Sequence, residues 1–243
     1  DTLKYNIFDN KTKYIIIMEP NVQTSKSCLL PLLVCEKLYN DYSYDIRIIL
    51  LCAPKTESFK NFLKNTNIFN DKKLELYPRI NTFAVIKQMS EKKNDCYFLS
   101  NQNDNPLNFL HLELFYLGFP LIHNTPNYSN CGYYYDNINK AVENLIYSFE
   151  NHFKNIKQYK KKVNKILNKY SPNNIKNVDI YKHLINNIIN FSIFDSCDSI
   201  VVMPTCGFAN RLRFIYTLYS ISKFYNKKLY IIWKKDETYC NID

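Results

Sequence analysis

Three polar residues in the middle of the sequence, Asp104, Asn105 and Glu113, are of the types that bind sugars and nucleotides. Asp104 and Asn105 lie in a polar loop at residues 101–105, and Glu113 lies in the apolar run that follows. An ionised carboxylate near the start of a helix accepts strong hydrogen bonds from the hydroxyl groups of a sugar or a ribose. The pattern therefore indicates a site for such a ligand. The alternative is that Glu113 is a solvated residue on a helix surface.

His123, Asn124 and Thr125 form a second polar group, at the end of a short apolar strand predicted at residues 121–123. Strand ends are positions where polar side chains commonly face a ligand. In open parallel sheets, ligands bind beside the loops at the carboxyl ends of strands, so we expect loop 101–105 and the loop after His123 to border one cleft. A purely structural role for His123 is the alternative.

Two basic residues elsewhere in the sequence are candidates for binding a phosphate. Lys26 lies between a predicted strand and a predicted helix, where backbone N–H groups and an ammonium group can meet an anion. Arg79 lies in a loop after another predicted strand. The alternatives are a solvated lysine near a helix start and an arginine in a surface salt bridge.

The elements that must position these residues alternate between strands and helices. Short, largely apolar runs predict strands at residues 14–18, 45–52, 74–77, 95–99 and 121–123, and the first of these runs is rich in β-branched residues. Apolar residues at helical spacing predict helices at residues 29–39, 58–65, 82–89, 107–117, 139–153, 156–170 and 174–191. This alternation predicts an α/β fold with a Rossmann-like, doubly wound parallel sheet.

The pattern restarts after a change of composition at residues 192–199. A strand is predicted at 199–204, a helix at 214–224 and a strand at 228–233. One βαβ unit cannot cover both faces of its own sheet. We therefore predict two domains, residues 1–195 and 196–243, and expect the second to be an incomplete βαβ unit of a truncated chain.

The loop predicted at residues 205–213 of the second domain contains further candidate residues. Gly207 permits close approach of the backbone to a ligand, and Asn210 can cap a helix or bind. Arg211 and Arg213 offer bidentate groups to acids or phosphates.

Composition excludes several classes of protein. With 243 residues and 46% hydrophobic residues, the chain can bury a substantial core. No run approaches the ~20 apolar residues of a membrane span, which predicts no transmembrane segment. Eight cysteines without a Cys-x-x-Cys pair predict neither a zinc site nor a disulfide framework, and they favour a reducing, cytoplasmic compartment. No metal site is predicted.

The net charge of +10 makes any polyanion an admissible partner. The lysines are spread along the chain apart from a cluster at residues 154–169, for which a solvated helix face is the alternative. No nucleic-acid-binding motif accompanies the charge, so no specific nucleic acid is expected as a partner. The abundance of Asn, Lys, Ile and Tyr resembles that of proteins from AT-rich genomes, including large DNA viruses, which would place the protein in a host cytoplasm.

The run NPLNFLHLELFYLGFPLIHNTP, followed by GYYYDN, resembles the nucleotide-sugar-binding half of GT-B glycosyltransferases. More narrowly, residues 14–190 resemble the DUF2827 family of GT-B-like proteins, in which a Glu-Pro-Asn loop followed by a lysine opens the C-terminal domain. The resemblance implies a donor-binding site made of Glu19, Asn21, Lys26, Arg79, Asp104, Asn105, Glu113, His123, Asn124, Thr125, Gly132 and Tyr133.

The run GFANRLR, followed by a helix and KLYIIW, is similar to the opening of fucosyltransferase-like GT-B domains. This resemblance covers about 45 residues, and Ala209 replaces the middle glycine of the usual pattern. In that family the nucleotide is held largely by the other half-domain, so a complete second active site is not implied.

Together the resemblances imply a metal-independent glycosyltransferase, hexosyl- or fucosyltransferase-like, that needs no cofactor. It would transfer a sugar from a nucleotide-sugar donor to a glycan, lipid or protein acceptor, and its catalytic residues are unassigned. The main alternative is a non-catalytic Rossmann-like module that binds a sugar or nucleotide or acts as a scaffold. A basic nucleic-acid-binding protein is a third interpretation, which rests on charge and tyrosine content alone.

Overall fold

The computed structural model describes residues 4, 5, 8, 11–21, 24–103, 108–171, 173–189, 197–204 and 208–232. The chain divides into two compact units, Asp1–Ser171 and Pro172–Asp243. Each unit has its own parallel sheet.

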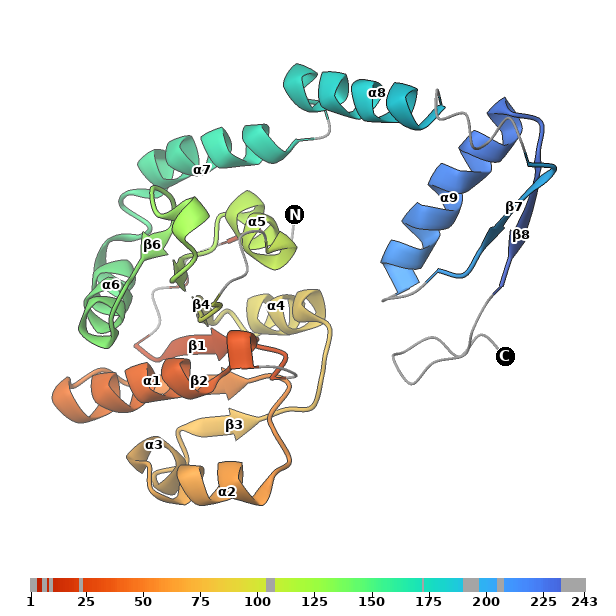
Figure 1. The fold of residues 1–243 in the computed structure, drawn as a ribbon. Helices are drawn as coiled ribbons and strands as arrows, with labels where there is room; N and C mark the ends of the chain where they lie inside the picture. The colour runs from red at the N-terminus through yellow and green to blue at the C-terminus, as the bar shows by residue number, and fades with distance from the viewer. Residues whose placement is uncertain are drawn as a thin grey trace. The chain divides into compact units, whose positions relative to one another are not determined.

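The first unit is built on a six-stranded sheet in which all neighbouring strands are parallel (Figure 1). Its strands are β1 (Lys13–Ile17), β2 (Ile46–Leu50), β3 (Leu74–Leu76), β4 (Asp95–Ser100), β5 (Leu121–His123) and β6 (Tyr133–Tyr134). Their order across the sheet is β3-β2-β1-β4-β5-β6. Strands β2 and β3 therefore lie on one side of β1, and β4, β5 and β6 follow in order on its other side. This order is that of a Rossmann-like doubly wound sheet, which confirms the predicted fold class.

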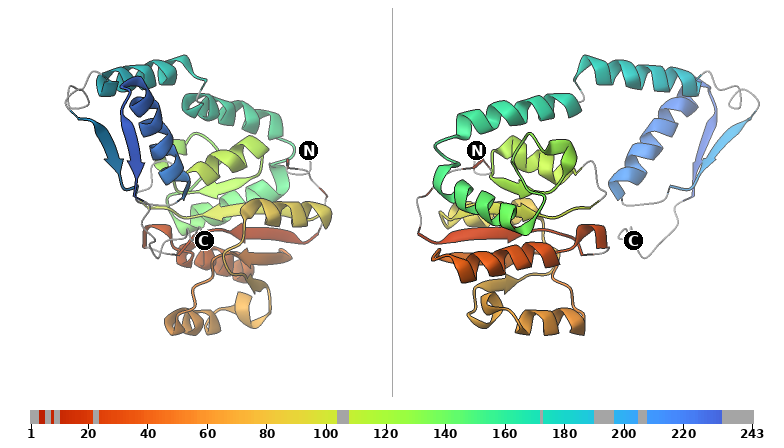
Figure 2. Two further views of the ribbon diagram at one scale, coloured as in Figure 1. Left: turned by 90° about the vertical axis from the view of Figure 1, so that its right-hand side faces the viewer. Right: turned by 60° about the vertical axis from the view of Figure 1, so that its left-hand side comes forward.

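Helices cover both faces of this sheet (Figure 2). They are α1 (Leu29–Asp41), α2 (Glu57–Lys64), α3 (Asn67–Asn70), α4 (Thr82–Glu91), α5 (Phe109–Leu117), α6 (Ile138–Asn151) and α7 (Ile156–Tyr170). Ile15 and Ile17 of β1 pack with residues of α1, α2, α3 and α6, whereas Ile16 packs with residues of α4, α5 and α7. All three isoleucines are fully buried. Burial on both faces explains why β1 is a continuous apolar run without polar alternation.

Asparagine and glycine residues fix the ends of several helices. The side chains of Asn81 and Asn108 cap the N-termini of α4 and α5 by accepting backbone N–H groups. Gly118 ends α5 with a φ of 83°, a left-handed conformation that glycine adopts without steric cost. The two asparagine side chains thus set the positions at which α4 and α5 begin.

The second unit contains α8 (Ile175–Ile189), β7 (Ser199–Val202), α9 (Phe208–Phe224) and β8 (Lys228–Ile231). The strands β7 and β8 are parallel, as predicted for a βαβ unit. Ile200 and Val202 pack against Ile221 of α9.

The prediction of a loop at residues 205–213 is partly wrong, because α9 begins at Phe208. Asn210, Arg211 and Arg213 consequently belong to a helix. Apolar residues at positions 208, 212 and 215 continue the helical period toward the N-terminus, a signal that the polar residues between them obscured.

Candidate functional site

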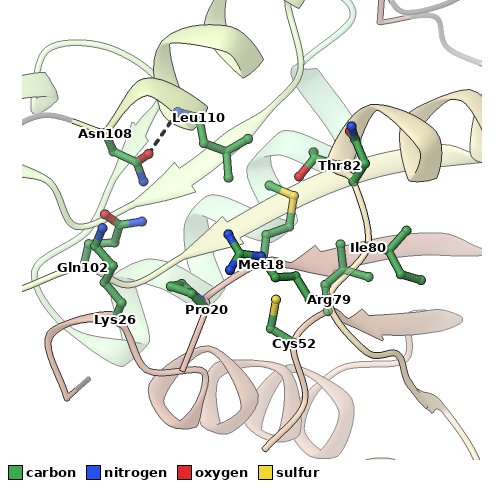
Figure 3. Close-up of a pocket in the computed structure, with 12 residues that line it drawn as sticks. Met18, Pro20, Lys26, Cys52, Arg79, Ile80, Thr82, Gln102, Asn108 and Leu110 are labelled. Atoms are coloured by element: carbon green, nitrogen blue, oxygen red, sulfur yellow. Dashed lines mark hydrogen bonds between the residues drawn. The ribbon is translucent and has the colours of Figure 1, made fainter. Parts of the chain in front are cut away.

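A cavity of about 510 Å³ lies beside the carboxyl ends of β1, β2 and β4 (Figure 3). After β1 the chain enters α1 on one face of the sheet, and after β4 it enters α5 on the other face. Because the two connections depart in opposite directions, a crevice remains between them, and ligands of doubly wound sheets bind at this point. We call it the main cavity.

Two cationic side chains line the main cavity. Lys26 ends the short 3₁₀ helix η1 (Thr24–Lys26), and Arg79 lies in the exposed loop between β3 and α4. In Figure 3 they lie on opposite sides of the cavity, with Lys26 beside Gln102 and the guanidinium of Arg79 directed toward Met18. Among the described residues that line the cavity there is no carboxylate. The charged side chains of the described lining are therefore both cationic.

Two helix N-termini also face the main cavity, through Asn81 and Asn108. The side-chain oxygen of Asn81 accepts the N–H of Phe83 at 2.9 Å, and that of Asn108 accepts the N–H of Leu110 at 2.9 Å. The N-terminus of a helix carries a partial positive charge and presents backbone N–H groups. Together with the two cations, these termini make the cavity suitable for an anion.

The wall of the main cavity also contains Cys52, Thr82 and Gln102. Cys52 has a φ of 58°, and its carbonyl oxygen accepts a hydrogen bond from Asn21. Burial raises the pKa of the Cys52 thiol, and the nearby Arg79 opposes this shift. The thiol is therefore a weakly reactive reporter group inside the cavity.

Glu19 links the loop that follows β1 to the loop that follows β4. Its carboxylate accepts hydrogen bonds from Ser100 Oγ at 2.5 Å, from the backbone N–H of Asn101 at 3.0 Å and from Gln102 Nε2 at 3.3 Å. Glu19 is only 1% exposed, and burial raises its pKa to about 7, against the effect of these hydrogen bonds. Its oxygens are therefore bound within the protein, and Gln102 links this interaction to the cavity wall.

His111 extends the interactions of Glu19 toward Thr125. The distance from His111 Nε2 to Ser100 Oγ is 2.8 Å, and that from Thr125 Oγ1 to His111 Nδ1 is 3.4 Å. When Glu19 is ionised, the hydroxyl of Ser100 donates its hydrogen to Glu19, so that His111 donates from Nε2 and accepts at Nδ1. Burial lowers the pKa of His111 well below its usual value, which fits this neutral form.

His123 is fully buried, and both of its ring nitrogens have protein partners. Its Nε2 lies 2.9 Å from the carbonyl oxygen of Cys131, and its Nδ1 accepts the N–H of Thr125 at 3.2 Å. Burial lowers the pKa of His123 to about 4. We refer to Glu19, Ser100, His111, His123 and Thr125 as the buried polar network.

Asn21 and Asn124 also use their side chains to join loops. Asn21, with a φ of 54°, donates to the carbonyl oxygens of Glu19 and Cys52 and accepts the N–H of Cys28. Asn124 accepts the N–H of Gln102 at 2.7 Å and donates to Asn101 Oδ1 at 2.9 Å. Both therefore hold together the loops that shape the main cavity.

Gly132 and Tyr133 lie at the start of β6 and are not among the residues that line the main cavity. A Cβ atom on Gly132, where φ is +63°, would lie 2.9 Å from His123 Nε2 and 2.9 Å from the carbonyl oxygen of Leu121. The hydroxyl of Tyr133 lies 2.8 Å from His152 Nδ1. Gly132 thus permits the close packing of the chain over His123.

Of the residues predicted for donor binding, the cavity lining includes Lys26 and Arg79. Glu113 is exposed on α5 and is not among the lining residues, although partial burial raises its pKa. Asp104, Asn105 and Gly207 lie outside the described residues, as do the side chains of Asn210, Arg211 and Arg213.

Four polar residues of the lining were not predicted from the sequence, namely Asn81, Thr82, Gln102 and Asn108. Asn81 and Asn108 each precede an apolar helical run, which is the signal of an N-cap residue. The N-cap residue of a helix that follows a parallel strand lies at the ligand-binding edge of the sheet. Both residues could therefore have been predicted from the sequence. The sequence around Gln102 contains no comparable signal.

Over the described ranges, no group of three or more His, Cys, Asp or Glu side chains could hold a metal ion. The six cysteines that the structure describes form no disulfide bond with one another. No helix within the described part of the chain has the length and apolar character needed to cross a membrane.

The fold and the cavity define a Rossmann-like α/β protein with a cationic cavity where its strand order reverses. Residues 2–185 match the model of the family described as Protein of unknown function (DUF2827), and the chain belongs to this family. This match confirms the DUF2827 resemblance. No curated protein matches the sequence.

Proposed function

We propose that the first unit binds the nucleoside diphosphate portion of a nucleotide sugar, and that the protein is a metal-independent GT-B glycosyltransferase. The sugar would pass from this donor to a glycan, lipid or protein acceptor. One observation carries the proposal: Lys26, Arg79 and the N-termini of α4 and α5 surround a cavity whose described lining contains no carboxylate.

The chemistry of sugar transfer matches this arrangement. When the glycosidic bond to the donor breaks, negative charge develops on the departing diphosphate. Fixed cations and helix N-termini aimed at that charge stabilise the transition state without having to reorganise. Lys26 and Arg79 would therefore act as electrostatic stabilisers of the leaving group, and the cap residues Asn81 and Asn108 would hold the helix termini in place.

A non-catalytic nucleotide-binding module is the second candidate, and one observation favours it. No Asp, Glu or His side chain occurs among the described residues that line the main cavity. His111 and His123 are buried, and their hydrogen bonds within the protein occupy both ring nitrogens. A general base for the acceptor hydroxyl is thus not part of the described lining.

The cytoplasmic compartment and the viral origin remain predictions.

Binding is tested with a thermal-shift panel of UDP, GDP, dTDP, CMP, their sugar conjugates and inorganic pyrophosphate. A ligand at 100 times its dissociation constant stabilises the fold by about 2.7 kcal/mol. We expect at least one nucleoside diphosphate to raise the melting temperature, and we expect Lys26→Ala and Arg79→Ala to weaken that shift. Lys161→Ala, which removes an exposed lysine of α7, is the matched control and should leave the shift unchanged. A shift that survives both cavity substitutions would refute the proposed site.

Activity separates the two candidates. A glycosyltransferase releases free nucleoside diphosphate from its nucleotide sugar when a suitable acceptor is present, whereas a binding module leaves the donor intact. Release that requires Lys26 and Arg79 would establish the enzyme. Saturable donor binding without release over an acceptor panel would favour the binding module.

A further inference from the structure

A second, smaller cavity of about 160 Å³ lies between α4 and the ends of β2 and β3. Leu51 and Ile80 line both this cavity and the main cavity, so the two adjoin. We call it the side pocket. The two cavities are therefore neighbours that share part of their walls.

The side pocket differs chemically from the main cavity. Its floor is apolar, since Ile49, Leu51, Val85 and Met89 are each at most 5% exposed. Among the described residues that line it, none carries a charge. An anion is thus favoured in the main cavity and an uncharged, largely apolar group in the side pocket.

Tyr77 and Gln88 supply the polar features of the side pocket. The hydroxyl of Tyr77 donates to Glu75 Oε2 at 2.8 Å, and its backbone N–H donates to the carbonyl oxygen of Leu50 at 2.9 Å. The aromatic ring is therefore held in place at the pocket wall. The side-chain amide of Gln88 is exposed and makes no hydrogen bond to any residue that the structure describes. It can both donate to and accept from a ligand.

On the basis of the proposed function, we propose that the side pocket holds the nucleobase of the donor, with Tyr77 against the ring and Gln88 at its hydrogen-bonding edge. A base has flat faces without hydrogen-bonding groups and carries its polar atoms only at its edge, so an apolar floor and one amide suffice. A sugar carries hydroxyl groups around its ring, and the apolar floor would leave several of them without partners.

This placement also orients the donor. The side pocket adjoins the main cavity at Ile80, which follows Arg79 directly in the chain. With the base in the side pocket, the diphosphate lies between Arg79 and Lys26, and the sugar is directed toward Gln102 and Asn108 on the far side of the main cavity (Figure 3). Gln88 is then the residue that discriminates between bases.

The test compares a nucleoside diphosphate with inorganic pyrophosphate by isothermal titration calorimetry on the full chain. The variant Ala84→Phe adds a ring at an exposed position of α4 that lines the side pocket. Lys87→Phe adds the same ring on α4 at an exposed position outside the lining and serves as the control. Retained pyrophosphate binding shows that each variant is folded.

We expect Ala84→Phe to weaken nucleoside diphosphate binding about tenfold or more and to leave pyrophosphate binding unchanged. We expect Gln88→Leu to alter the order of affinities among bases, and Lys87→Phe to have no effect. Wild-type nucleoside diphosphate affinity in Ala84→Phe would overturn the base assignment, yet leave the proposed function standing. If the wild-type protein binds neither ligand, the proposed function fails and the base assignment fails with it.

Discussion

The buried polar network and the main cavity lie at the same edge of the sheet, yet they differ in the charged side chains that they contain. In the network, the carboxylate of Glu19 and both nitrogens of His123 are occupied by protein donors and acceptors. In the main cavity, Lys26 and Arg79 occur without a carboxylate among the described lining residues. The charged group of the network is therefore a buried carboxylate that the protein itself supplies with hydrogen bonds, whereas the charged groups of the described cavity lining are cations.

This difference separates the polar groups that maintain the fold from those that remain available to a ligand. A buried group with all of its partners is costly to remove, because each partner is left unsatisfied in a medium of low polarity. An exposed cation costs little to remove but contributes directly to the potential that a ligand meets. Substitutions in the network should therefore change stability, and those in the cavity should change binding.

The largest effect is expected for Glu19→Ala. This change leaves Ser100, the N–H of Asn101 and Gln102 without their acceptor, and we expect a loss of about 4 kcal/mol in the free energy of unfolding. Urea unfolding measures it, with Glu57→Ala as the control, since Glu57 forms only an exposed ion pair with Lys60. A Glu19→Ala protein of unchanged stability that no longer binds nucleotide would place Glu19 among the ligand-binding residues instead.

Gly132→Ala should destabilise the protein by about 3 kcal/mol. The new Cβ meets His123 Nε2 and a carbonyl oxygen at 2.9 Å, in a left-handed conformation that disfavours a side chain. Gly118→Ala is the matched control. Its Cβ meets the flexible end of Lys160 at 2.9 Å, which can move away, so a loss of about 1 kcal/mol is expected. Equal losses in the two variants would show that packing over His123 contributes nothing specific.

The pH dependence of stability tests Glu19 separately from the histidines. Its pKa rises from 4.5 to about 7 on folding, so its contribution is fully present below pH 4.5 and is lost as the pH rises to 7. The pKa values of His123 and His152 fall from 6.5 to about 4, so their contributions increase with pH over that interval. The two effects partly cancel in the wild-type protein.

Glu19→Gln removes only the contribution that falls with pH. The stability of this variant should therefore rise more steeply than that of the wild type between pH 4.5 and 6.5, by about 1.4 kcal/mol per pH unit. Urea unfolding at several pH values in this interval gives both slopes. Parallel slopes would mean that Glu19 titrates alike in the folded and unfolded chains.

The smallest effect on stability is expected in the main cavity itself. Arg79 is exposed, and Arg79→Ala should change the free energy of unfolding by less than about 1 kcal/mol. The same variant should weaken nucleoside diphosphate binding about tenfold or more, because a charged hydrogen bond to the phosphate is lost. Equal binding by wild type and variant would remove Arg79 from the site.

Glu113→Ala tests the same difference between binding and stability at a residue that was predicted from the sequence to lie in the donor site. Because Glu113 is exposed on α5 outside the cavity lining, we expect less than about a twofold change in nucleotide affinity and about 0.5 kcal/mol or less in stability. A loss comparable to that of Arg79→Ala would restore Glu113 to the donor site.

The sequence was sufficient for the fold class because most strands of the first unit, apart from the short β3 and β6, are largely apolar runs bounded by turns. Lys26 and Arg79 were chosen as candidates because they lie in loops that follow strands, and both line the main cavity. It could not distinguish Glu19 or His123 from ligand-binding residues. Their partners, Ser100 and Cys131, are distant in sequence or face them only after the strands pair.

The most direct test of the central claim is the rate at which Cys52 reacts with a maleimide, with and without a saturating nucleoside diphosphate. Peptide mass spectrometry follows Cys52 together with Cys197, a partly exposed thiol of the second unit that serves as the internal control. A ligand held between Lys26 and Arg79 covers Cys52, so its labelling should slow about tenfold while that of Cys197 stays constant. Unchanged labelling of Cys52 under saturating ligand would contradict the assignment of the main cavity as the nucleotide site.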